Sequence, residues 1–251
     1  MRLNLFQNTI AFSHPKVKRP HTKITGITLK IIAMGTMIID HLAIVLWSNV
    51  TLTMNGLWFG DGNIPLPYLV MRLIGRIAFP LFAFLLVEGF WHTRNVWEYA
   101  KRLFLMAVIS EIPYDLALHQ TWIDWGSQNV FFTLLLALGA LWGIEYYRDL
   151  KPEIGFLIVM LMGVIAEILH TDYQSFGVGL VVILYVLHER PQLESLWGSL
   201  LCLFEGMSVI GSFILTSVYN GERGRGNGRV WYWIYPLHLL VFAFIRSLLL
   251  K

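Results

Sequence analysis

Charged residues are scarce in this chain. Asp, Glu, Lys and Arg together make up 14% of its 251 residues, whereas a soluble globular domain contains about 25%. Hydrophobic residues make up 56% of the chain, and the mean hydropathy is +0.60. This composition excludes an ordinary soluble domain, and we expect an integral membrane protein.

Several kinds of site are also missing from the sequence. Its one cysteine, Cys202, excludes an internal disulfide and a cysteine-based metal centre. No His-Glu-x-x-His, phosphate-loop, dinucleotide or Gly-x-Ser-x-Gly motif is present, so we expect no metal. The net charge is +3, but without a basic domain or a nucleic-acid motif we expect no nucleic-acid partner. The remaining ionisable groups suit acid–base chemistry or group transfer.

Apolar stretches close to the roughly 20 residues of a membrane helix recur along the chain. Eight candidate spans lie near residues 28–48, 68–91, 102–119, 129–147, 154–170, 175–188, 195–218 and 230–249. They predict an all-α polytopic bundle of about eight transmembrane segments in the lipid bilayer. We expect one helical domain, residues 28–251, after a basic tail at residues 1–27.

The charges of the loops predict the orientation. Lys and Arg are absent from Asn49–Pro67 and Glu111–Gln128, whereas His92–Arg102 and Glu145–Glu153 contain them. Since loops rich in Lys and Arg stay in the cytoplasm, we expect a cytoplasmic N-terminus. The two loops without Lys or Arg are expected outside.

The segment Tyr219–Val230 conflicts with this alternation. It contains Arg223, Arg225 and Arg229 in a glycine-rich stretch, yet strict alternation puts it outside. Either this loop is an exception that binds an anion, or the short segment 175–188 does not cross the bilayer fully. We favour the second explanation, which makes the loop cytoplasmic.

An adjacent ionisable pair, Asp40 and His41, lies within the first span. A charge at such a depth costs roughly 2.5–3.5 kcal/mol on insertion scales, so we interpret the pair as a candidate reactive centre. Neighbouring helical residues point about 100° apart, so we expect Asp40 to bond another helix while His41 faces a cavity. The alternative is a hydrogen bond that only holds the bundle together.

Arg72 and Arg76 lie four residues apart on one face of the second span. Because both stay charged, they need carboxylates, carbonyl oxygens or an anionic ligand nearby. The alternative is that their side chains extend to the membrane interface.

Pro113 is expected to bend or break its helix, which would gather Glu111 and Asp115 around a cavity or in an outer loop.

Three further polar residues have structural alternatives. Glu88 is either a substrate contact or an interfacial carboxylate. Asn129 is a substrate contact or, as we favour, the cap of the fourth span. His238, which follows Pro236 in the last span, is open between a site residue and a buried structural one.

Taken in order, these segments resemble the TraX family. The matching stretches are Ile39-Asp40-His41, Arg72 to Phe84, Glu88-Gly89-Phe90, Ile109 to Asp115, Gln128 to Thr133, Tyr219-Asn220-Gly221 and Tyr235-Pro236-Leu237-His238. The resemblance runs from about residue 28 to the C-terminus and leaves the basic tail outside.

The resemblance implies an N-acetyltransferase of the bacterial inner membrane. It would transfer acetyl from acetyl-CoA to the N-terminal amine of an F-type conjugative pilin, in a fold distantly similar to multi-span membrane acyltransferases. On this hypothesis His41 is a general base or an acetyl carrier, and Asp40 orients it. Arg72 and Arg76 would stabilise anionic charge.

The same hypothesis assigns binding residues. The substrate-binding candidates are Glu88, Glu111, Asp115, Asn129 and His238, and the candidates for the CoA phosphates are Arg223, Arg225 and Arg229. The alternative function is a membrane transporter or a non-enzymatic pilin-assembly factor, because intramembrane ionisable residues also mark transport pathways.

Overall fold

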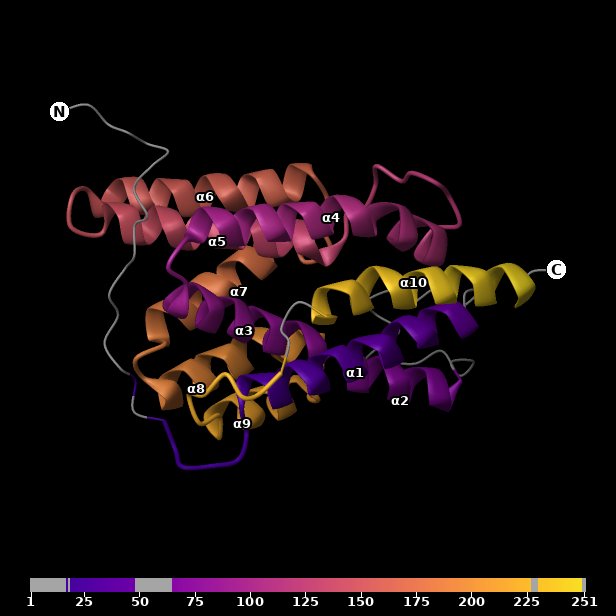
Figure 1. Ribbon diagram of the computed structural model, residues 1–251, viewed down its shortest axis with the longest axis horizontal. Helices are drawn as coiled ribbons and strands as arrows, with labels where there is room; N and C mark the ends of the chain where they lie inside the picture. The colour runs from indigo at the N-terminus through magenta and orange to yellow at the C-terminus, as the bar shows by residue number, and fades with distance from the viewer. Residues whose placement is uncertain (1–16, 18, 48–64, 227–229, 250–251) are drawn as a thin grey trace. The chain divides into compact units, whose positions relative to one another are not determined.

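The computed structural model describes residues 17, 19–47, 65–226 and 230–249, and the regular elements of this part of the chain are helices (Figure 1). The helices are α1 (Gly26–Leu46), α2 (Leu66–Gly75), α3 (Ala78–His92), α4 (Val96–Leu118), α5 (Val130–Tyr147), α6 (Pro152–Ile168), α7 (Gln174–Leu187), α8 (Pro191–Cys202), the 3-10 helix η2 (Leu203–Glu205), α9 (Val209–Ser217) and α10 (Val230–Leu249). The all-α class is confirmed for the described residues.

The helices form two compact units, each described here by itself. Among the described residues, unit 1 comprises residues 17, 83–108 and 125–190, and unit 2 comprises residues 19–47, 65–82, 109–124, 191–226 and 230–249. Helices α3 and α4 contribute residues to both units. That residues 28–251 form one domain stays a prediction.

Four stretches of the described chain are long and apolar enough to cross a membrane, which supports membrane insertion. They are Gly26–Leu46, Leu66–His92, Val130–Tyr147 and Val230–Leu248. The remaining expected spans are not confirmed. With 14 residues, α7 is about 21 Å long, less than the roughly 30 Å of a hydrocarbon core. That segment 175–188 does not cross fully stays a prediction.

Two expected spans are interrupted. Residues 68–91 divide into α2 and α3 at Arg76 and Ile77. Residues 195–218 divide into α8, η2 and α9, and η2 ends at Gly206, whose φ of +123° suits a residue without a Cβ atom. Breaks in an apolar stretch free backbone polar groups, so membrane proteins place them where protein or a cavity satisfies those groups.

Helix α4 continues through Pro113 to Leu118, so of the two expected effects of Pro113, a bend or a break, the break does not occur. A proline removes one amide donor, and membrane helices tolerate that loss where neighbouring groups satisfy the freed backbone. The helix ends at Leu118, where Arg246 of α10 contacts its last carbonyl oxygens. Nη1 of Arg246 donates to the carbonyl oxygens of Ala117 (2.6 Å) and Leu118 (2.7 Å).

In unit 1, α5, α6 and α7 pack through small residues. A Cβ atom at Gly143 of α5 would lie 2.5 Å from Cγ2 of Ile158 in α6. A Cβ atom at Gly155 of α6 would lie 3.2 Å from Cα of Ile144. Such residues let helix backbones approach closely, which is how membrane helices associate without a hydrophobic driving force.

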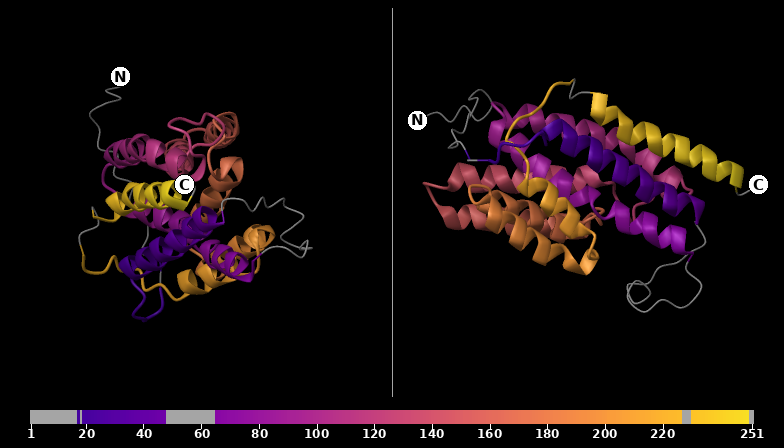
Figure 2. Two further views of the ribbon diagram at one scale, coloured as in Figure 1. Left: turned by 90° about the vertical axis from the view of Figure 1, so that its right-hand side faces the viewer. Right: turned by 90° about the horizontal axis from the view of Figure 1, so that it is seen from below.

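In unit 2, the loop before α10 forms backbone hydrogen bonds with the start of α1. The amide of Gly26 donates to the carbonyl oxygen of Glu222 (2.8 Å). The amide of Ile27 donates to the carbonyl oxygen of Arg223 (3.0 Å). These bonds satisfy amides that a helix leaves free at its first turn. Figure 2 shows α1 and α10 side by side, running in the same direction from this end.

The two ends of unit 2 are therefore distinguishable. The loop at residues 219–226 lies where the N-terminal segment enters α1. Arg246, which holds the end of α4, follows Val230 by about 24 Å of helix. Because α10 is long enough to cross a membrane, the loop and the residues that follow α4 are expected on opposite faces of the bilayer.

Cysteine labelling tests this arrangement. In a Cys202→Ser background, we expect Lys23→Cys and Arg225→Cys to react with an impermeant maleimide from one side of sealed vesicles. Thr121→Cys should react only from the other side. If position 225 labels together with position 121, the placement of the loop is wrong.

Candidate functional site

Four of the predicted site residues come together on three helices of unit 2. Asp40 and His41 lie in the second half of α1, Arg72 lies near the end of α2, and His238 lies in the middle of α10. Their side chains form two contacts, one between α1 and α2 and one between α1 and α10.

The first contact is an ion pair in which Nη1 of Arg72 donates to Oδ2 of Asp40. Both side chains are mostly buried, with 16% and 18% of their surface exposed. Within the described residues, Oδ1 of Asp40 and Nε of Arg72 have no hydrogen-bond partner. The geometry therefore agrees with the expectation that Asp40 bonds a neighbouring helix, and it leaves one donor of Arg72 available.

Gly75 allows this ion pair to form. A Cβ atom at Gly75 would lie 2.0 Å from Oδ1 of Asp40 and 2.3 Å from its Cβ. A distance below 3.0 Å between such atoms requires a shift, so any larger residue at this position would displace Asp40 or α2. The glycine thus sets the approach of α2 to α1.

Arg76, one turn after Arg72, pairs with Glu205 of η2. The sequence analysis missed Glu205, although it is an isolated carboxylate in an expected apolar span. Each of the two arginines therefore meets a carboxylate, which is one of the partners that their charge requires. An anionic ligand is not needed to explain their position.

The second contact joins two histidine rings. Nδ1 of His41 lies 2.8 Å from Nε2 of His238, and the rings are coplanar, with an interplanar angle of 1°. Nδ1 of His238 lies 2.9 Å from the carbonyl oxygen of Ile234. Tyr235, which the sequence analysis named within a motif but not as a site residue, presents its ring edge-on to both histidines. His41 and His238 each expose 9% of their surface.

Both ring nitrogens of His238 have partners within unit 2, Nδ1 of His41 and the carbonyl oxygen of Ile234. The substrate-binding role that we expected for His238 stays a prediction. In the sequence, only the Tyr235-Pro236-Leu237-His238 motif pointed to His238. Its pairing with His41 had no local signal, because 197 positions separate the two histidines.

The acidic residues of α4 take part in the end of that helix. Asp115 is fully buried, and its Oδ2 accepts from the amide of Asp124 (2.8 Å). Its other oxygen, Oδ1, has no partner among the described residues. Glu111 lies one turn earlier on the same helix and is partly buried. Asp115 thus holds the segment that follows α4 through its Oδ2, while its Oδ1 has no donor among the described residues.

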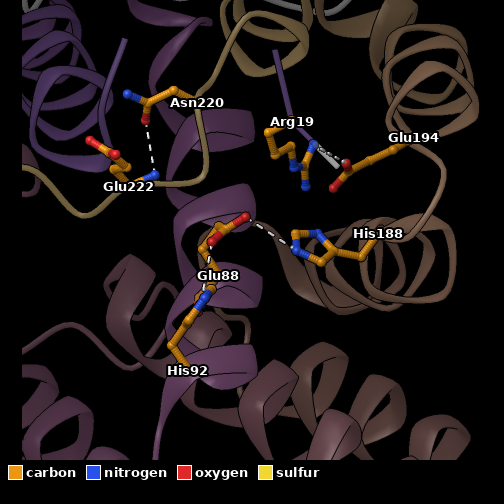
Figure 3. Close-up of polar contacts among 7 residues, drawn as sticks. All are labelled: Arg19, Glu88, His92, His188, Glu194, Asn220 and Glu222. Atoms are coloured by element: carbon orange, nitrogen blue, oxygen red, sulfur yellow. Dashed lines mark hydrogen bonds and ion pairs between the residues drawn. The ribbon is translucent and has the colours of Figure 1, made fainter. Parts of the chain in front are cut away.

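Glu88 and Asn129 lie in unit 1, where each has structural partners. Oε1 of Glu88 lies 3.2 Å from Nε2 of His188, a buried residue that the sequence analysis missed (Figure 3). Asn129 caps α5 by accepting from the amide of Phe131 (3.0 Å), as we favoured, and donates to the carbonyl oxygen of Ala107 (2.8 Å). These contacts support structural roles for both residues.

The loop before α10 presents exposed arginines beside the start of α1. Arg223 and Arg225 are exposed, whereas Arg229 lies outside the described residues. The turn relies on Gly221 and Gly224, whose φ angles are +78° and +80°. In the same unit, the N-terminal segment is anchored by a buried ion pair between Arg19 and Glu194 (3.3 Å; Figure 3). The exposed arginines offer a surface for anionic groups.

A family model described as TraX protein matches residues 25–246. The chain belongs to the TraX family. The TraX match begins at Thr25, the N-cap of α1, and ends at Arg246 in α10, so it includes both contacts of the site. Among the described residues, no group of three or more His, Cys, Asp or Glu side chains is arranged to hold a metal ion.

A curated relative comes from Dichelobacter nodosus. It is described as "Probable fimbrial assembly protein FimC, serogroup H1" and is 27% identical to this TraX chain over 252 residues. The alignment covers 88% of this chain and 95% of the relative. No solved structure matches this chain.

A pair of glycine substitutions tests the geometry around Asp40 in TraX. Gly75→Ala is expected to lower stability by about 1–3 kcal/mol, because the added methyl group overlaps Asp40. Gly35→Ala on α1 is the control, since a Cβ atom there meets nothing within 4 Å. Thermal unfolding of the purified protein in detergent measures both. Equal stability of the two variants would contradict the close approach of α2 to α1.

Proposed function

We propose that this protein is an inner-membrane N-acetyltransferase that transfers acetyl from acetyl-CoA to the N-terminal amine of pilin. The observation that carries the proposal is the paired His41 and His238 beside the ion pair of Asp40 and Arg72. Acid–base and anion-stabilising groups are thus gathered on helices that are otherwise apolar. Such intramembrane polar groups are costly and usually functional.

The chemistry of acetyl transfer fits these groups. An amine attacks a thioester only in its neutral form, so a base is needed to take a proton, and histidine exchanges protons near neutral pH. Negative charge develops on the carbonyl oxygen during the attack. Arg72 pairs with Asp40, the residue next to His41 in sequence, and its Nε, which has no partner among the described residues, is the proposed donor for that oxygen. Asp40 holds Arg72 in place.

The loop before α10 is the proposed site for the CoA phosphates. Arg223 and Arg225 are exposed at the end of unit 2 where α1 begins. We place this end in the cytoplasm, where acetyl-CoA is made, because the N-terminal segment carries basic residues. His41 follows Gly26 by about 22 Å of helix. An extended pantetheine arm lying along α1 would bring the thioester toward the histidine.

The pilin acceptor rests on the resemblance and on the relative described as a fimbrial assembly protein. Asp115, with one oxygen free of partners, is a candidate for the protonated amine before it reacts. The description of the relative also favours a second function, a pilin-assembly factor without catalysis. That factor would change the amount of assembled pilin but leave its N-terminus unmodified.

Replacing His41 separates the two functions. His41→Ala should lower acetylation of the pilin N-terminus by roughly 10²–10⁴-fold, the usual loss of a general base, while the protein still accumulates in the membrane. Mass spectrometry of pilin from cells with either form measures the modification. His21→Ala is the control, because His21 is an exposed histidine outside the site.

Two results would count against the enzyme. If pilin from wild-type cells carries no added acetyl group but its assembly fails without this protein, the assembly factor is the better function. If His41→Ala accumulates normally and still gives fully acetylated pilin at the normal rate, the histidine pair is structural.

Replacing the loop arginines tests the CoA site. Arg223→Gln and Arg225→Gln should each raise KM for acetyl-CoA with little change in kcat. The expected loss of binding free energy is roughly 1–3 kcal/mol for each charge-assisted contact removed. Lys101→Gln is the matched control, since Lys101 is an exposed residue paired with Glu98 in unit 1. Steady-state kinetics of purified protein with a pilin N-terminal peptide measure both constants. An unchanged KM would assign the loop a purely structural role.

A further inference from the structure

We propose that His238 is a positioning residue that fixes the tautomer of His41 and makes Nε2 of His41 its reacting atom. The inference rests on the proposed function for the reaction itself, but the tautomer can be observed without any activity. It follows from the two hydrogen bonds of His238, taken in order from the backbone toward His41.

The first bond fixes the proton of His238. Its Nδ1 lies 2.9 Å from the carbonyl oxygen of Ile234. A carbonyl oxygen can only accept, so Nδ1 of His238 carries a hydrogen. In a neutral imidazole one nitrogen donates and the other accepts, so Nε2 of His238 presents a lone pair.

The second bond passes this arrangement to His41. Nε2 of His238 lies 2.8 Å from Nδ1 of His41, and the coplanar rings direct the lone pair at that nitrogen. Nδ1 of His41 must therefore carry the hydrogen. The lone pair of His41 is then on Nε2, the nitrogen that can take a proton from an amine or form a bond to an acetyl carbon.

Burial disfavours the alternative. If His238 were doubly protonated, its Nε2 would donate and the tautomer of His41 would be reversed. Both histidines are buried, and each exposes only 9% of its surface. Within the described residues, no carboxylate is paired with either ring that would offset a cation in this apolar setting. The neutral pair is the arrangement that the surroundings permit.

The same bond supports charge formation during the reaction. When Nε2 of His41 takes a proton from the attacking amine, His41 becomes an imidazolium with a hydrogen on each nitrogen. Nδ1 keeps its hydrogen and donates it to His238, so the new positive charge has an acceptor beside it. No proton leaves the pair in this step, and the later return of the Nε2 proton restores the starting tautomer.

Substitutions at position 238 test the positioning role through kcat. His238→Leu removes the acceptor and should lower kcat by roughly 10- to 100-fold, the size of effect seen when a partner that orients a metal-bound histidine is lost, with KM nearly unchanged. His238→Gln keeps an acceptor oxygen and should recover most of the loss. His21→Gln is the control for the substitution itself, because His21 is exposed and outside the site.

Nitrogen-15 NMR of histidine-labelled protein in lipid nanodiscs provides the readout that does not depend on activity. The His41 signals, identified by their loss in His41→Gln, should show a protonated Nδ1 and a bare Nε2. In His238→Leu they should shift toward a mixture of tautomers. This result together with a wild-type protein that transfers no acetyl would uphold the tautomer and reject the proposed enzyme.

Either of two findings would overturn the inference. One is a His41 ring protonated at Nε2 and bare at Nδ1 in the wild-type protein. The other is a folded His238→Leu variant, matched to wild type in thermal unfolding, whose kcat and His41 spectrum are both unchanged.

Discussion

Polar side chains within apolar helices have to pair with one another, and this constraint governs the arrangement of unit 2. Asp40 pairs with Arg72, Arg76 with Glu205, and His41 with His238. A buried charge that loses its partner costs about 3–5 kcal/mol, which is a large share of the stability of a small domain. The pairs therefore decide where α2 and α10 meet α1 and where η2 meets the end of α2, and packing adapts to them, as Gly75 does beside Asp40.

Sequence reasoning identified the polar residues better than it identified their partners. The 100° rotation between adjacent helical residues was enough to expect that Asp40 bonds a neighbouring helix, and it does. His41, which was expected to face a cavity, instead bonds His238 of α10 through Nδ1. Helix-end chemistry likewise gave the cap at Asn129. The partner of His41 was beyond such rules, because His238 is 197 positions away and its pairing depends on how helices pack.

Two expectations that differ from the structure concern where helices are interrupted. Pro113 was expected to bend or break its helix, yet α4 is not broken there and continues to Leu118. Arg246 donates to the carbonyl oxygens of Ala117 and Leu118 at the end of the helix. Hydropathy merged α8, η2 and α9 into one expected span, because an average over residues 195–218 does not register the single charge of Glu205. That charge was the available signal, and its pairing with Arg76 lies at the interruption of both spans.

On the proposed function, the pairing constraint also explains why a histidine is the group left to react. Arg72 and Arg76 are each neutralised by a carboxylate, so they hold positions and supply donors without adding net charge to the site. A neutral histidine pair adds none either. On the proposed function, this leaves an apolar surrounding in which a proton moving from an amine to Nε2 of His41 creates the largest change of charge. Hydrogen bonds aimed at such a charge count for more in surroundings of low dielectric constant than they would in water. The groups that the membrane forces to pair are thus those that keep the reacting nitrogen oriented before any substrate arrives.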